Sequence, residues 1–150
     1  MSSLPSTPER CKLLITKWRR ELCLSNFEAS QFNNALKDLD KQIYRLINKK
    51  FRITAFGRVG VGKSSLLNAL NMNNVFITDI AHGCTKIVQS STWQQRIKGL
   101  EEIELVDTPG IDEVAAEDRE KIAHKVALGA DLILLVIDSD LTSIELKALE

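Results

Sequence analysis

One stretch of the chain has residue types and spacing suited to binding phosphate. Residues 57–64 read Gly-Arg-Val-Gly-Val-Gly-Lys-Ser, which fits the pattern G-x-x-x-x-G-K-[ST]. Glycines let a backbone wrap closely around phosphate oxygens, because a Cβ would collide there. Lys63 can reach the β- and γ-phosphates of a nucleotide, and the Ser64 hydroxyl can ligate Mg²⁺. The alternative is a glycine turn followed by an ordinary surface lysine.

The residues on both sides of this stretch supply the context that a phosphate-binding loop needs. Residues 51–56 are typical of a strand, and residues 65–70 are typical of a helix. A loop between them turns several backbone N–H groups inward, and the helix adds the positive end of its dipole. We therefore predict that the loop and the residue after it contact a nucleotide. These residues are Gly57, Arg58, Val59, Gly60, Val61, Gly62, Lys63, Ser64 and Ser65.

A second motif follows an apolar strand later in the chain. Residues 104–110 read Glu-Leu-Val-Asp-Thr-Pro-Gly, so Asp107 stands at the carboxyl end of the strand and Gly110 follows it. Such an aspartate can hold Mg²⁺, usually through a water, and Gly110 can present its N–H to a γ-phosphate. Alone, this motif would indicate a Pro-Gly turn. Because both motifs follow predicted strands in the right order, together they indicate nucleotide binding.

With both motifs in hand, the chain resembles a P-loop GTPase. Asp-Thr-Pro-Gly at 107–110 is similar to the translation-factor-related branch, and residues 57–70 resemble the Era and TrmE type. The resemblance covers about residues 51–150. It implies an α/β, Ras-like P-loop NTPase fold of three layers, with GTP or GDP as ligand and Mg²⁺ as cofactor.

The resemblance also implies roles for single residues. The threonine of the family's first switch loop matches Thr85, within the sequence His-Gly-Cys-Thr-Lys. Ser64, Thr85 and Asp107 would then form the metal site. Lys63, Thr85 and Gly110 would act on the γ-phosphate. For Thr85, an ordinary loop threonine stays open as the alternative.

Three departures from the family pattern affect the expected activity. The base-reading motif Asn-Lys-x-Asp is absent, so the guanine preference rests on the resemblance. Gly60 stands where potassium-activated members carry asparagine. Ile111 stands where Ras-type enzymes place a glutamine, and isoleucine cannot orient the attacking water. The catalytic group would come from a partner, a dimer mate or another loop. Arg58 could supply an arginine-finger-like group, although a solvent-directed side chain is favoured.

The expected function is therefore slow hydrolysis of the GTP β–γ bond as a molecular switch. In this reading the protein is a phosphoric anhydride hydrolase with weak intrinsic activity, and these 150 residues alone could be inactive. Two alternatives stay open. One is a non-hydrolysing regulatory or scaffold module that nucleotide only stabilises. The other is an ATP-using P-loop enzyme.

Composition limits the partners and the compartment. The chain is 44% apolar and 27% charged, with a formal net charge of zero. This balance removes any bulk electrostatic case for nucleic acid or an anionic membrane, and leaves association with RNA, the ribosome or a membrane undetermined. The three cysteines are widely spaced, which fits a reducing, cytoplasmic setting. No apolar run approaches the ~20 residues of a membrane span.

Helical patterns dominate the first third of the chain. Residues 1–8 are expected to be a disordered start and residues 9–50 a helical extension. One helix is predicted over about 8–23, and Ser25 with Glu28 predicts a capping box for a second. The second helix carries an apolar stripe that could pack on the rest of the chain, which is favoured, or bind a partner or a second copy. The stripe consists of Phe32, Leu36, Leu39, Ile43 and Leu46.

From residue 51 onward the pattern becomes α/β. Strands are predicted at 51–56, 86–95, 100–107 and 131–137, and helices at 63–71, 117–128 and from 142. Residues 75–85 and 108–118 are the expected switch loops. These are about four of the six strands of a Ras-like domain, so 51–150 is interpreted as the N-terminal part of a GTPase domain, cut before the base-binding motif. The strand at 131–137 would then lie partly uncovered and promote association.

Overall fold

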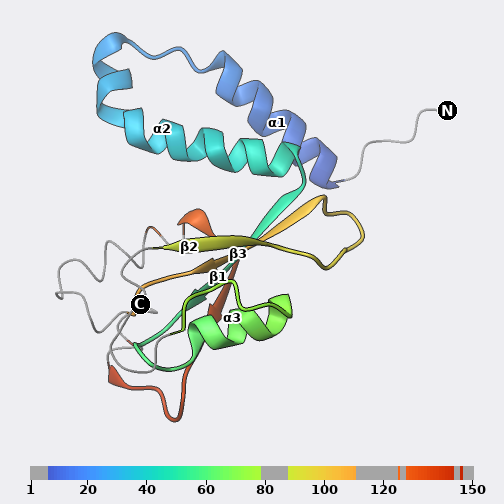
Figure 1. The fold of residues 1–150 in the computed structure, drawn as a ribbon. Helices are drawn as coiled ribbons and strands as arrows, with labels where there is room; N and C mark the ends of the chain where they lie inside the picture. Colours follow the sequence, from blue (N-terminus) through green and yellow to red (C-terminus); the bar gives the residue numbers. More distant parts are fainter. Residues whose placement is uncertain (1–6, 79–87, 111–124, 126–127, 144–145, 147–150) are drawn as a thin grey trace. The chain divides into compact units, whose positions relative to one another are not determined.

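The computed structural model describes residues 7–78, 88–110, 125, 128–143 and 146. The chain divides into two compact units, Met1–Lys50 and Phe51–Glu150. Figure 1 shows two helices in the first unit, and a sheet with a helix in the second.

The first unit is a helical hairpin of α1 (Thr7–Glu21) and α2 (Asn26–Ile47). The Arg19 guanidinium donates to both carboxylate oxygens of Asp40, from Nε at 2.7 Å and from Nη2 at 2.9 Å. Near the other end, Lys12 Nζ donates to the carbonyl of Ile47 at 3.2 Å. These two pairs fix an antiparallel register. The hydrogen bonds to Asp40 are the main reason that the pKa of Arg19 lies above its usual value.

The start of α2 confirms the predicted capping box. The Ser25 hydroxyl accepts from the Glu28 N–H at 3.3 Å, and the Glu28 carboxylate accepts from the Ser25 N–H at 2.9 Å. Both bonds satisfy N–H groups that a helix leaves unpaired at its first turn. Of the predicted apolar stripe, Ile43 is buried, while Phe32 is exposed. Leu36 and Leu39 are half-buried, and Leu46 is exposed. The stripe is therefore covered in its middle and exposed at both ends.

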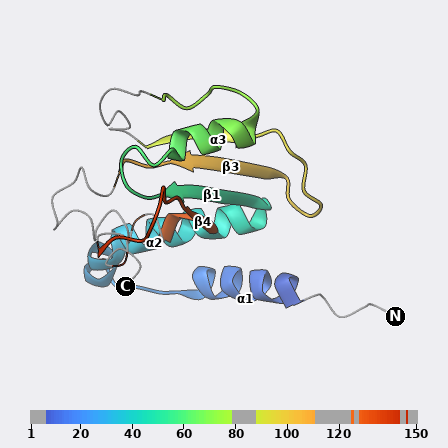
Figure 2. The same ribbon diagram turned by 90° about the horizontal axis from the view of Figure 1, so that it is seen from below.

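The second unit is built on a four-stranded sheet of order β2-β3-β1-β4. The strands are β1 (Lys50–Phe56), β2 (Gln89–Trp93), β3 (Glu102–Asp107) and β4 (Leu132–Leu135). β4 pairs parallel with β1, and β2 pairs antiparallel with β3. Figure 2 shows the arrows of β1 and β3 running the same way. The carboxyl ends of β1, β3 and β4 therefore share one edge of the sheet, where α/β folds hold ligands.

The core lies between this sheet and α3 (Lys63–Asn71), which packs beside β3 (Figures 1 and 2). Its buried side chains come from alternate positions of β1 and β3, from α3 and from the loop after it. They are Ile53, Ala55, Leu67, Phe76, Ile103 and Leu105. Alternation places one face of each strand toward the helix, so α3 is held firmly over the sheet.

The predicted strands and the α3 helix are present. β1 begins one residue earlier than predicted, while β3 and β4 are shorter than their predicted ranges. An apolar run such as 131–137 is typical of a strand that is buried on both faces, yet Leu132 is 45% exposed and Ile133 41% exposed. The reason is position, because β4 is the outermost of the described strands. The expected partial uncovering of this strand is thereby confirmed. The predicted helix at 117–128 and both switch loops fall largely outside the described residues.

Candidate functional site

The loop after β1 has a backbone that requires glycine. Gly60 and Gly62 have φ of 77° and 91°, the left-handed region that other residues rarely adopt. At Gly57 a Cβ would collide with the Val136 carbonyl oxygen, just past β4. Val136 in turn donates its N–H to the Phe56 carbonyl at 2.8 Å. The loop is thus folded tightly against the ends of β1 and β4.

Lys63 curls back over this loop. Its side chain is buried, with 6% exposed, and Nζ donates to the carbonyls of Gly57 at 3.1 Å and Arg58 at 2.6 Å. A buried charge is costly unless surrounding groups stabilise it. The first turn of α3 therefore holds a positive charge that an anion at the loop would stabilise.

The two sequence motifs meet at Ser64 and Asp107. Ser64 Oγ donates to Asp107 Oδ2 at 2.5 Å, although the residues are 43 positions apart. The Asp107 side chain is 0% exposed. Next to it, the buried hydroxyl of Thr108 donates to the Ala55 carbonyl at 2.7 Å. That bond ties the end of β3 to β1 and so fixes Asp107 beside the loop.

Gly110 packs directly on the phosphate-binding loop. A Cβ at this position would overlap Val59, lying 2.6 Å from its nitrogen and 2.8 Å from its Cα. Backbone cannot give way as a flexible side chain can, so the contact requires glycine. The sequence predicted a γ-phosphate contact for Gly110, and the structure adds a packing reason for the residue.

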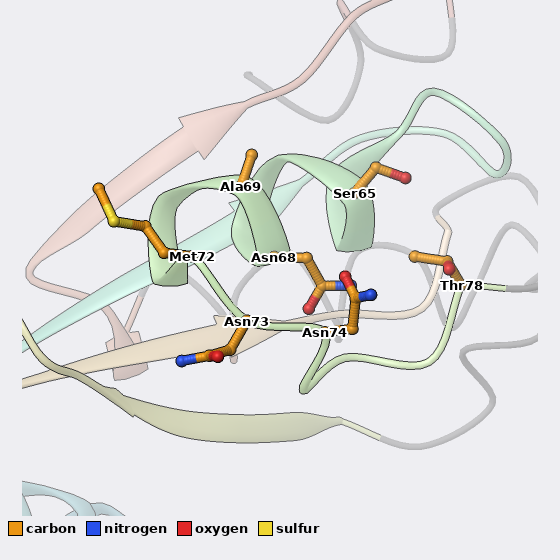
Figure 3. Close-up of a pocket in the computed structure, with 7 residues that line it drawn as sticks. All are labelled: Ser65, Asn68, Ala69, Met72, Asn73, Asn74 and Thr78. Carbon is orange, nitrogen blue, oxygen red and sulfur yellow. The ribbon is translucent and has the colours of Figure 1, made fainter.

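The remaining predicted site residues differ in their burial and in their location. Arg58 is half-buried, not fully directed to solvent, and Val59 and Val61 are also half-buried. Ser65 is exposed, and its side chain lies in a different groove on α3 (Figure 3). Thr85 and Ile111 lie outside the described residues. The structure therefore brings together residues 57–64, Asp107 and Gly110.

This arrangement fits a bound Mg²⁺. A hydroxyl and a carboxylate lie within hydrogen-bonding distance of each other, and both are the hard oxygen ligands that Mg²⁺ prefers. Within the described ranges there is no group of three or more His, Cys, Asp or Glu that could hold a metal alone. Mg²⁺ usually combines one or two protein oxygens with waters and substrate phosphates, so such a sparse donor set is the expected one.

Asn68 is a buried residue that the sequence reasoning missed. Its amide binds the backbone of Val75 and Phe76 through three hydrogen bonds. Beside it lies an open groove of about 550 Å³ (Figure 3). Ser65, Asn68, Ala69, Met72, Asn73, Asn74 and Thr78 line the groove. The sequence offers one weak indication of this role, a polar residue on the buried side of a short helix. Helix propensity does not reveal which backbone groups such a residue would bind.

The glycine-rich loop, the buried lysine and the serine–aspartate pair define a P-loop nucleotide-binding protein. Residues 52–150 match the model of the 50S ribosome-binding GTPase family. The chain belongs to this family, and the expectation of a P-loop GTPase is confirmed.

Its curated relatives include several tRNA modification GTPases named MnmE, the TrmE type of the sequence analysis. The protein of Thermoanaerobacter sp. (strain X514) is 35% identical over 113 residues, which cover 69% of this chain and 24% of that protein. The protein of Synechococcus elongatus is 38% identical over 98 residues, 63% of this chain and 20% of that protein. The chain thus spans about a quarter or less of the length of these relatives. Of the two types named in the sequence analysis, Era and TrmE, these relatives favour TrmE.

Among solved structures, a dimerisation-deficient mutant of Toc33 from Arabidopsis thaliana has a TM-score of 0.45 and 22% identity, covering 72% of this chain and 44% of that chain. Toc33 in complex with Mg²⁺ and GMPPNP has a TM-score of 0.43 and 21% identity, with coverage of 71% and 45%. Both are loose likenesses. No helix within the part of the chain that the structure describes is long and apolar enough to cross a membrane.

Proposed function

We propose that this chain binds GTP and GDP through residues 57–64 and works as a switch that hydrolyses GTP slowly. The observation that supports this most is the 2.5 Å bond from Ser64 Oγ to Asp107 Oδ2. It joins the two motifs of a P-loop GTPase in one place, and the preceding residue, Lys63, is buried. Membership of a GTPase family supports the choice of ligand.

Each residue has a role in this proposal. Lys63 and the N–H groups of the loop bind the β- and γ-phosphates, where they stabilise charge that develops during transfer. Ser64, Thr85 and Asp107 hold Mg²⁺, with Asp107 acting through a water. When bound, Mg²⁺ neutralises charge on the phosphate oxygens. Gly110 keeps the second motif close enough to the loop for its N–H to reach the γ-phosphate.

Slow hydrolysis follows from the residue after Gly110. Ile111 has no hydrogen-bonding side chain, so it cannot orient a water. The half-buried Arg58 belongs to the loop itself, and nothing in its placement assigns it a catalytic role. We therefore propose that a partner, a dimer mate or another loop supplies the activating group.

The same proposal extends to domains and partners. Residues 51–150 would form the GTPase part, in a cytoplasmic protein, and residues 9–50 a helical extension. Several large apolar side chains of the hairpin are exposed, among them Leu13, Phe27 and Phe32, and exposed apolar surface favours self-association. Relatives named for tRNA modification make tRNA the first nucleic acid to test. The net charge of zero gives this partner no electrostatic support.

Phosphate release from GTP, measured in multiple turnovers with Mg²⁺, tests the proposed activity. We expect a rate on the order of 10⁻⁴ to 10⁻³ s⁻¹, typical of a GTPase without its activating group. Lys63→Ala should reduce release to the background rate. The matched control is Lys98→Ala, an exposed lysine in the turn between β2 and β3, which should not change the rate.

The two alternatives predict different results. A non-hydrolysing module would bind GTP and release no phosphate above the Lys63→Ala background, even with added partner. An ATP-using enzyme would show ATP displacing labelled GDP as well as GTP does. This competition is needed because these 150 residues contain no Asn-Lys-x-Asp motif that would read the base.

A further inference from the structure

The first helix, α1, presents large apolar side chains to solvent. Leu13 and Leu14 are each 65% exposed, and Trp18 is 52% exposed. None of the residues of α1, all of which the structure describes, is buried. Surface helices normally turn such side chains toward a core and leave charged ones in water. A cluster of exposed apolar side chains of this kind marks an interaction surface.

The contacts that hold α1 beside α2 come from another side of the helix (Figure 1). Arg19 donates to Asp40, and Lys12 donates to the Ile47 carbonyl. Lys12 and Arg19 are seven positions apart, so they share one side of α1. These polar contacts hold the hairpin together, while the exposed leucines and the tryptophan stay in water.

Two cations accompany the exposed apolar side chains. Positions 10, 13, 14, 17 and 18 follow the spacing i, i+3, i+4, i+7 and i+8, which places them on one face of a helix. All five residues are exposed, and we call them the outward face of α1. Lys17 Nζ lies 3.9 Å from the Glu21 carboxylate, and such surface pairs are weak. The outward face consists of Arg10, Leu13, Leu14, Lys17 and Trp18.

The charge of the chain is divided unequally between its two units. Residues 1–50 contain ten Lys and Arg against five Asp and Glu, and residues 51–150 contain ten against fifteen. The formal net charge of zero therefore consists of +5 on the first unit and −5 on the second. An excess of positive charge around an exposed apolar face complements an anionic surface.

From this exposure and this charge we propose that the outward face of α1 binds the surface of an anionic lipid bilayer. The leucines and the tryptophan enter the boundary between head groups and acyl chains, and Arg10 and Lys17 bind lipid phosphates. Long cationic side chains can keep their stems among apolar groups while the charge reaches the head groups. With 15 residues, α1 lies along the surface and does not span it. This inference does not rest on the proposed nucleotide binding.

Other occupants fit the outward face less well. The same face of a second copy would set Arg10 and Lys17 against identical cations, which repel. Self-association of the hairpin would then use α2, where Phe32 is exposed. A partner groove that takes a helix binds its apolar residues and leaves cations on the other face, whereas here both kinds share one face. A nucleic acid would bind the cations and give the leucines no partner.

Flotation of the 150-residue chain with lipid vesicles tests the inference. One set of vesicles is phosphatidylcholine alone, and in the other set phosphatidylserine replaces part of it. We expect binding to the anionic vesicles only. High salt should release the chain, because it screens the attraction between the Lys and Arg side chains and the lipid.

Tryptophan fluorescence reports whether the outward face itself enters the lipid. Trp18 and Trp93 are the two tryptophans of the chain, so Trp93→Phe leaves Trp18 as the only one. We expect the emission of Trp18 in this variant to shift to the blue on anionic vesicles, because the indole leaves water for the interface. Vesicles of phosphatidylcholine alone should leave the emission unchanged.

Two variants remove the two kinds of contact separately. Trp18→Ala should bind anionic vesicles about tenfold more weakly, because the burial of a large aromatic side chain is lost. The double variant Arg10→Gln/Lys17→Gln should bind about twentyfold more weakly, at roughly fivefold for each cation near the lipid surface. Circular dichroism should show unchanged helix content in both, since all three side chains are exposed.

Matched controls change exposed residues of α2. Phe27→Ala removes an aromatic side chain that is also exposed. Lys37→Gln/Lys41→Gln removes two cations, of which Lys41 pairs with Asp38 at 2.9 Å. Both controls should bind within about threefold of wild type, because the attraction of charges to the surface falls off within about 10 Å.

Several results would overturn the inference. Equal binding to both kinds of vesicle, or binding to neither, rules out an anionic lipid surface. A loss in the α2 controls as large as in the α1 variants rules out the outward face of α1. Without vesicle binding, tRNA binding that only Arg10→Gln/Lys17→Gln abolishes would assign the face to nucleic acid, and a dimer that Leu14→Ser dissociates would assign it to a second copy. None of these results bears on nucleotide binding, so the proposed function would stand.

Discussion

The Asp107 carboxylate is fully buried at the end of β3, where its Oδ2 accepts a hydrogen bond from the Ser64 hydroxyl. A buried carboxylate is costly unless it is well compensated, so a bound cation gives it a reason to be there. We expect Asp107→Asn to weaken GTP binding about tenfold in Mg²⁺, since it keeps the side chain's shape and removes its charge.

In EDTA the same change should have little effect, because the metal-dependent part of the affinity is then absent in wild type as well. Asp138 is an exposed aspartate three residues after the end of β4, and Asp138→Asn is the control variant. Equal loss with and without Mg²⁺ would show that Asp107 serves folding and not the metal.

Gly110 offers a separate test of how the two motifs pack. Gly110→Ala places a methyl group against the Val59 backbone, and overpacking of this kind costs about 1–3 kcal/mol. Gly129→Ala is the matched control, because a Cβ there lies 3.7 Å from Arg52 Nη1, an ordinary contact distance. Chemical denaturation should show a loss of stability for Gly110→Ala only. Equal stability of the two variants would contradict the close packing of Gly110 on the loop.

For single residues, the sequence predicts contacts between members of a recognised motif and misses contacts that belong to no motif. The two motifs and the family resemblance predicted that Ser64 and Asp107 serve one site, and Ser64 Oγ lies 2.5 Å from Asp107 Oδ2. The contact of Gly110 with Val59 and the bonds of Asn68 to Phe76 depend on three-dimensional packing, which neither residue type reveals. The roles proposed for Thr85 and the other loop residues stay predictions.

At the N-terminus of α2, the contribution of the capping box to stability can be tested by changing the pH. Hydrogen bonds from the Ser25 side chain and then its backbone N–H lower the pKa of Glu28 below its ordinary value of 4.5. A lowered pKa in the folded state stabilises the helix above the unfolded value, and this stability is lost as pH falls through the folded value. The capping box should therefore contribute fully at pH 7 and lose its carboxylate part below about pH 4.5.

Ser25→Ala removes the hydroxyl of this box and should cost about 1 kcal/mol at pH 7, the usual value for a lost helix N-cap. Hydrogen exchange in the first turn of α2 measures the effect, with α3 as internal reference. The difference between wild type and Ser25→Ala should shrink at acid pH. A difference that stayed constant from pH 7 to below the Glu28 pKa would contradict the reciprocal box.

Helices and strands were predictable here in kind and order, and less so in extent. The strand predicted at 86–95 has a described core of Gln89–Trp93, and that predicted at 131–137 pairs over Leu132–Leu135. Apolar patterns report burial, whereas the length of a strand is set by its hydrogen-bonded neighbours. The exposure of Ile133 was hard to predict for the same reason, because the residues of a strand do not show whether it lies at the edge of its sheet.

Considered as a whole molecule, the chain presents apolar surface at β4. Leu132 and Ile133 are both substantially exposed on the outermost described strand. Exposed apolar edge strands pair with other chains. We expect concentration-dependent association of the 150-residue chain in sedimentation experiments, and a shift toward monomer in Ile133→Lys, because a charge on an edge strand opposes pairing. Ser91→Lys, on the strand at the opposite edge, is the control. A wild-type chain that stays monomeric at all concentrations would contradict this expectation.

The central claim is that residues 57–64 bind a guanine nucleotide through the ammonium of Lys63. The most direct measurement is calorimetric titration of the wild-type chain and Lys63→Ala with GTP in the presence of Mg²⁺. We predict saturable binding to wild type and a loss of about a hundredfold or more in Lys63→Ala, because charged hydrogen bonds to two phosphates disappear. Lys98→Ala should bind like wild type. Equal affinity of wild type and Lys63→Ala, or no binding by either, would contradict the account.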